Sequence, residues 1–278
     1  MRSELAALGA VILWASLAAL GSLLSDIPPF LLTGIGLLIG SLISLPVSGF
    51  QMRKLIVKPR VLLLGVYGLF GYHAALFAAL QNAPPVQVNL VNYLWPLLIV
   101  VLAPLFFPTA RLTLRKATAA LAGFCGAGLA ILSGSQISGG FEVGYLYGLL
   151  AAVIWSTYSL GTKRIGDFPT AGVGLFGLVA GVLALVAHFA FEERVAIEPA
   201  DWPLLVALGL GALGGAFYLW DYALKRGDAQ RIGLIAFITP LLSTLALVVV
   251  TGSQPSAMLL MAAALIFGGA WFGGRENN

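Results

Sequence analysis

Amide and aromatic side chains that could bind a small molecule lie inside long apolar stretches of this chain. Asn89, Asn92 and Tyr93 share one helical face with Pro96, and Trp95 lies at the edge of that face. Amides donate and accept hydrogen bonds, and indole and phenol rings stack and attract cations. The pattern therefore predicts a binding surface.

Residues of the same kinds lie on other predicted helices. Trp155, Tyr158 and Ser159 share a second helical face. Further candidates for the same site are Trp14, Tyr72, His73 and Ser243. Membrane enzymes usually display clusters of His or Asp, and no such cluster is visible in the sequence. We therefore expect no catalytic residue, no metal and no cofactor, and we expect Cys125 to be a small buried packing residue.

The composition requires lipid around these residues. Of 278 residues, 60% are hydrophobic and 9% are charged, whereas soluble domains are about 25% charged. Ten apolar stretches are each close to the roughly 20 residues that cross a bilayer. The predicted spans are 4–24, 29–48, 60–82, 85–107, 115–133, 143–163, 170–191, 202–224, 230–251 and 255–273. The first is longer than the roughly 7–15 residues of a signal-peptide core, so we expect it to be a span.

Positive charge falls on one side of these spans. Of the 15 Lys and Arg residues, all except Arg194 lie at the termini or in loops on the side of the N-terminus. Since positively charged loops are retained in the cytoplasm, we expect both termini to be cytoplasmic in a bacterial-type inner membrane. This distribution explains the net charge of +4 without nucleic acid. The expected partners are membrane lipid and a small molecule, and the chain could act as a monomer.

An internal repeat relates the two halves of the chain. A shift of 144 residues aligns Pro96-Leu97-Leu98 with Pro240-Leu241-Leu242, and a shift of 141 aligns Trp14 with Trp155. The repeat holds five spans, and because five is odd the second copy enters the membrane in the opposite sense. We predict an all-α integral membrane fold of ten transmembrane helices, built from inverted repeats at residues 1–134 and 142–275.

Pro96 and Pro240 lie near the middle of the fourth and ninth predicted spans. A proline inside a helix removes one N–H donor and frees the carbonyl four residues earlier, here that of Asn92 or Ala236. Irregular backbone at this depth is tolerated where it lines a cavity, and transporters bind substrate there. We expect both prolines to act as hinges, with simple packing kinks as the alternative.

Ten spans in two inverted halves, Trp14-Ala15-Ser16 in the first span and the two mid-span prolines resemble the drug/metabolite transporter superfamily, in its EamA-like branch. Val91-Asn92-Tyr93-Leu94-Trp95-Pro96 is similar to the aromatic amino acid exporters of the YddG type. The second half departs from this hexapeptide, since Thr239 takes the place of Trp95. The resemblance implies a carrier that exports aromatic and other neutral amino acids by alternating access.

An amino acid substrate would need three kinds of contact. Its ammonium group prefers carbonyls or an aromatic face, at roughly 0.5–2 kcal/mol. Its carboxylate needs N–H or amide donors, and an aromatic side chain needs rings, at roughly 0.5–1.5 kcal/mol per pair. Asn89, Asn92, Tyr93, Trp95 and Trp155 could supply all three, although each aromatic ring could instead be an interfacial anchor.

Other functions remain open. A multidrug or organic-cation exporter of the same fold would need carboxylates in the cavity, and Asp221 is the only acid clearly inside a span. We expect Asp221 to pair with Lys225, four residues later, and His73 to be a ligand or a packing residue. A membrane enzyme and a passive channel are less consistent with the sequence. With no deep acid to hold a proton, we expect facilitated diffusion.

Residues near the span ends have simpler expected roles. His188 and the tryptophans Trp202, Trp220 and Trp271 are expected at the membrane interface. Gly36 and Gly40 fit close packing between helices.

Overall fold

The computed structural model describes residues 2–133, 140–166, 168–251 and 256–274. Within these ranges the secondary structure consists of helices and their connections, with no strand. The prediction of an all-α chain is confirmed. Three predicted boundaries, at residues 134, 255 and 275, lie outside the described residues.

The first half of the chain begins with short helices and ends with a long one. Its elements are α1 (Arg2–Ala15), α2 (Leu17–Leu23), α3 (Pro29–Ser41), α4 (Ser44–Ser48), η1 (Met52–Lys54), α5 (Pro59–Val66), η2 (Tyr67–Gly71), α6 (Tyr72–Gln81), α7 (Pro85–Asn92), α8 (Leu94–Phe106) and α9 (Leu114–Leu132).

The second half follows a similar order. Its elements are α10 (Gly144–Ile165), η3 (Thr170–Gly172), α11 (Val173–Phe191), α12 (Trp202–Leu210), η4 (Gly211–Gly215), α13 (Ala216–Arg226), α14 (Ala229–Ala236), α15 (Ile238–Thr251) and α16 (Ala257–Gly274).

Among the described residues, eight helical stretches are long and apolar enough to cross a membrane. They are Arg2–Leu23, Pro29–Ser48, Pro59–Gln81, Pro85–Phe106, Leu114–Leu132, Thr170–Phe191, Trp202–Arg226 and Ala229–Ala246. Two further predicted spans are helical but fall outside this set. α10 carries several Tyr, Trp, Ser and Thr residues along its length, which lower its hydropathy, and the apolar stretch Ala257–Gly273 is shorter.

Several of these stretches are interrupted near their middle. η2 and η4 are π-helical turns, at Tyr67–Gly71 and Gly211–Gly215. α7 passes into α8 through Tyr93 (φ −67°, ψ 6°), and α14 passes into α15 through Phe237 (φ −64°, ψ −13°). A shift of 144 residues carries the first π-turn onto the second, and Tyr93 onto Phe237. Each half therefore breaks its helices at equivalent positions.

Glycine allows the helices to approach closely on one side of the bundle. A Cβ atom added to Gly40 would lie 2.7 Å from the Gly214 Cα, and one added to Gly36 would lie 2.5 Å from a methyl carbon of Leu213. α3 also packs along α11, where a Cβ on Gly34 would lie 3.2 Å from the Gly181 carbonyl. The close packing expected for Gly36 and Gly40 is confirmed.

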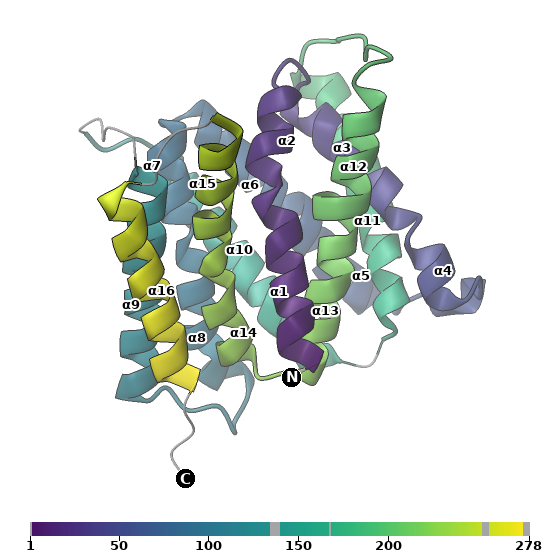
Figure 1. The fold of residues 1–278 in the computed structure, drawn as a ribbon. Coiled ribbons are helices and arrows are strands. Elements are labelled where there is room, and N and C mark those ends of the chain that lie inside the picture. The colour runs from purple at the N-terminus through teal and green to yellow at the C-terminus, as the bar shows by residue number, and fades with distance from the viewer. Residues whose placement is uncertain (1, 134–139, 167, 252–255, 275–278) are drawn as a thin grey trace.

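Basic side chains join helix ends at one end of the bundle. Lys163 donates hydrogen bonds to the carbonyls of Leu224 and Gly227, at 3.0 and 2.6 Å. Lys116 donates to Gln230 at 2.6 Å. Figure 1 places the start of α1 and the described end of α16 at this same end.

Two expectations about single residues are wrong. Cys125 is exposed, because it lies on the outer side of α9, one turn after the exposed Leu121. His188 is buried rather than interfacial, at 2% exposure. Its Nδ1 lies 2.9 Å from Glu192 Oε2, and this carboxylate accepts hydrogen bonds from the N–H groups of Phe30 and Leu31. The pair therefore caps the start of α3 from the end of α11.

Candidate functional site

A cavity of about 600 Å³ lies among the two halves of the chain. Three tryptophans, two tyrosines and two phenylalanines are among its lining residues, although only 11% of the whole chain is aromatic. Its lining also includes Leu17 and Gly21 from α2, Leu80 from α6 and Ile131 from α9. These residues lie toward the end of the bundle away from the N-terminus, so the cavity extends toward that end.

The floor of the cavity is a cluster of aromatic rings, called the aromatic floor below: Trp14, Trp95, Trp155, Phe217 and Trp220. The Trp14 ring centroid lies 6.2, 5.6, 6.1 and 5.2 Å from those of the other four, in that order. Such separations are within the range of favourable aromatic contacts. Trp14, Trp95, Trp155 and Phe217 line the cavity.

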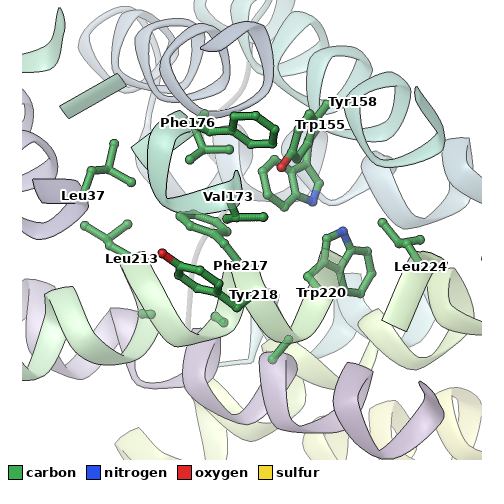
Figure 2. Packing of buried hydrophobic residues seen from close by; sticks show 14 of the residues in the cluster. Leu37, Trp155, Tyr158, Val173, Phe176, Leu213, Phe217, Tyr218, Trp220 and Leu224 are labelled. Carbon is green, nitrogen blue, oxygen red and sulfur yellow. The ribbon is translucent and has the colours of Figure 1, made fainter. Parts of the chain in front are cut away.

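Figure 2 shows how α10 and α13 contribute to this floor, with Trp155 and Tyr158 facing Phe217 and Trp220. Trp220 was expected at the membrane interface, and that expectation is wrong, because its side chain is 1% exposed. Its indole N–H donates to the Ser159 hydroxyl at 3.0 Å. This hydrogen bond connects the two helices beneath the cavity.

Tyr158 and Ser159 lie behind the cavity surface. Both are buried, and neither is among the residues that line the cavity. Tyr158 packs against Trp155 at 5.2 Å between centroids. Its ring also lies over Gly68, in the first π-turn, where a Cβ atom would come within 2.2 Å of it. The structure therefore places these two residues as supports of the aromatic floor.

One wall of the cavity is polar. Tyr72, His73, Asn89, Asn92 and Tyr93 line it, and their role in binding a substrate stays a prediction. Asn92 Nδ2 donates to the Tyr72 hydroxyl at 3.1 Å. Its Oδ1 is buried and has no hydrogen-bond partner among the described residues.

The ninth predicted span completes the lining with Thr239, Pro240, Ser243 and Thr244. Pro240 lines the cavity, whereas Pro96 does not. The carbonyl of Ala236, which the proline was expected to free, already accepts a hydrogen bond from the Thr239 hydroxyl at 2.8 Å. The Thr239 hydroxyl therefore provides the hydrogen bond that the Ala236 carbonyl lacks at the helix break of the second half.

Within the part of the chain that the structure describes, no Asp, Glu, Lys or Arg lines this cavity. The pairing expected for Asp221 is confirmed, since Lys225 Nζ lies 2.8 Å from its Oδ2. The Thr170 hydroxyl donates to the same oxygen at 2.7 Å. Asp221 is thus held beside the cavity and does not line it. The described residues also hold no group of three His, Cys, Asp or Glu side chains suited to a metal.

Sequence reasoning missed several apolar lining residues, among them Phe77, Leu213 and Phe217. Each is an ordinary apolar residue in an apolar helix, so its type carries no signal of function. Their places become visible only when helices distant in the sequence are brought together.

Several apolar, membrane-length helices around a cavity lined with aromatic rings are typical of a multi-pass membrane protein. The sequence model of the EamA-like transporter family matches residues 1–132 and again residues 142–273. The chain belongs to the EamA-like transporter family. It is therefore a membrane transporter and not an enzyme.

Similar proteins carry a more specific description. The chain is 41% identical over 269 residues to an aromatic amino acid exporter YddG of Ancylobacter novellus. The aligned region covers 94% of this chain and 93% of that protein. It is 25% identical to the aromatic amino acid exporter YddG of Escherichia coli, over 97% of this chain and 95% of that protein. A chain in a solved crystal structure matches with a TM-score of 0.90 at 38% identity, covering 98% of this chain and 97% of the other.

Proposed function

We propose that this chain exports aromatic and other neutral amino acids across the inner membrane by alternating access at a site near the midplane. The observation that carries the proposal is the cavity itself. Its described lining combines seven aromatic residues with amide and hydroxyl groups and contains no Asp, Glu, Lys or Arg. The description of similar proteins as aromatic amino acid exporters supports it.

The charge of the cavity restricts the substrate. An unpaired charge moved from water into an apolar environment loses several kcal/mol of solvation. A zwitterionic amino acid carries no net charge, and its ammonium and carboxylate groups can bind aromatic faces and amide donors. An organic cation would find no carboxylate among the lining residues, since Asp221 is bound to Lys225. This argues against the multidrug alternative.

We infer that the chain crosses the membrane ten times as two inverted five-helix repeats, 1–134 and 142–275. The two matches to one family model, at 1–132 and 142–273, support this division. The equivalent π-turns at Tyr67–Gly71 and Gly211–Gly215 support it independently. In this arrangement α10 and α16 complete the ten spans.

The proposed orientation places both termini in the cytoplasm, because all Lys and Arg residues except Arg194 fall on that side. The cavity then extends toward the outside, and the hydrogen bonds of Lys116 and Lys163 hold its cytoplasmic side together. Transport would require these bonds to break while the outer ends approach each other. The helix breaks near Pro96 and Pro240 would absorb this change.

Titration calorimetry on the purified transporter tests the proposed substrate class. Phenylalanine and tryptophan should bind more tightly than alanine, and lysine and glutamate should bind most weakly. Preferential binding of lysine, or of a lipophilic cation such as tetraphenylphosphonium, would contradict the proposal.

A further inference from the structure

His73 occupies an unusual place in the polar wall of the cavity. Its side chain is 8% exposed and lines the cavity. The imidazole lies between two rings, with its centroid 5.2 Å from that of Tyr72 and 5.9 Å from that of Phe77. Among the described residues that line the cavity, His73 is the one with an imidazole, and none of them is acidic.

The backbone fixes which ring nitrogen of His73 carries hydrogen. Nδ1 lies 2.6 Å from the carbonyl oxygen of Leu69, one helical turn earlier and inside the π-turn Tyr67–Gly71. A carbonyl oxygen only accepts hydrogen bonds, so Nδ1 must be the donor. In the neutral imidazole the other nitrogen, Nε2, then carries the lone pair and is an acceptor.

This acceptor is directed away from its own helix. Because Nδ1 points back to the backbone, Nε2 lies on the opposite side of the ring from the Leu69 carbonyl, in a side chain that lines the cavity. The bond to Leu69 is the hydrogen bond that the His73 ring makes among the described residues, and it uses Nδ1. The cavity therefore presents a lone pair that a bound molecule can satisfy.

We propose that His73 Nε2 accepts a hydrogen bond from the α-ammonium group of the substrate. The inference rests on the proposed function and assigns one end of the amino acid within the cavity. An ammonium group is a donor with no acceptor capacity, so it matches a lone pair and not an N–H. The ring of Tyr72 lies 5.2 Å from both His73 and Trp155. A substrate ammonium at His73 thus leaves its side chain over the aromatic floor.

Two substitutions distinguish the role of Nδ1 from the role of Nε2 in His73. His73→Asn keeps an amide at the position of Nδ1, where it can bond Leu69, and removes the group at Nε2. His73→Gln places an amide oxygen at the position of Nε2. His73→Asn should weaken phenylalanine binding about tenfold to a hundredfold, the range for one hydrogen bond to a charged group. His73→Gln should lose less affinity than His73→Asn, because the amide oxygen still accepts a hydrogen bond there.

The ligand can be changed instead of the protein. N,N,N-trimethylphenylalanine keeps the positive charge and the aromatic ring but has no N–H group. Aromatic faces attract a quaternary ammonium as well as a primary one. If His73 accepts an N–H, the wild-type transporter should bind this analogue at least about tenfold more weakly than phenylalanine. Both measurements use titration calorimetry on the full chain, with thermal unfolding to confirm that each variant is folded.

Equal phenylalanine affinities for wild type and His73→Asn would overturn the assignment. So would equal losses in the Asn and Gln variants, or equal wild-type affinities for phenylalanine and its trimethyl analogue. These failures differ from a failure of the proposed function, in which the wild-type chain would bind no aromatic amino acid.

Discussion

Removal of one ring from the aromatic floor should change the preference among substrates. The Trp155 centroid lies within 5.2–6.3 Å of five other rings, so it is the most connected residue of the floor. Trp155→Leu keeps an apolar side chain but removes an aromatic partner of the substrate. One aromatic pair contributes roughly 0.5–1.5 kcal/mol beyond its buried area, which is about 2- to 13-fold in affinity. Alanine as substrate has no ring and should lose less.

The assay is half-saturation of transport in proteoliposomes with phenylalanine and alanine. Trp271→Leu is the matched control, because Trp271 is 62% exposed and does not line the cavity. Trp155→Leu should raise the half-saturation concentration for phenylalanine more than for alanine, and the control should change neither. An equal change for both substrates, or no change for either, would refute the role of Trp155 in substrate binding.

Three further outcomes are expected. Gly40→Ala should lower thermal stability, because a Cβ atom added there would lie 2.7 Å from backbone atoms. Gly21→Ala should leave thermal stability unchanged, because a Cβ atom added there would have no neighbouring atom within 4 Å. A Pro240→Ala variant should insert and fold normally but transport more slowly, since the helix break is filled; wild-type transport would leave the proline as a packing kink. With the single native cysteine removed, Ala200→Cys should react with an impermeant thiol reagent on intact cells and Lys54→Cys should not; the reverse pattern would overturn the orientation.

Much of the site could be predicted because membrane helices restrict polar groups so strongly. Asn89, Asn92 and His73 are unusual at mid-depth in lipid, so their residue types alone mark a cavity. The three lining tryptophans follow from the same reasoning. Trp220 could not be recognised, since its position near a span end is typical of an interfacial anchor, and its contact with Trp14 joins opposite ends of the sequence.

The π-helical turns could not be predicted from the sequence either. Pro96 and Pro240 indicated breaks in two helices, but the π-turns at Tyr67–Gly71 and Gly211–Gly215 contain no proline. In the first of these turns Tyr158, from a helix distant in the sequence, packs against Gly68. The sequence carries no rule for such turns, although the repeat of 144 residues relates them once one is known.

Counterflow in proteoliposomes tests the central claim most directly. Vesicles containing the purified transporter are loaded with one unlabelled amino acid and diluted into labelled phenylalanine. Internal phenylalanine, tryptophan or another neutral amino acid should drive transient uptake of the label, and lysine or glutamate should not. Because none of the described lining residues is an acid, this uptake should need neither a pH gradient nor a membrane potential. Exchange driven equally by lysine, or the absence of exchange with every neutral amino acid, would contradict the account.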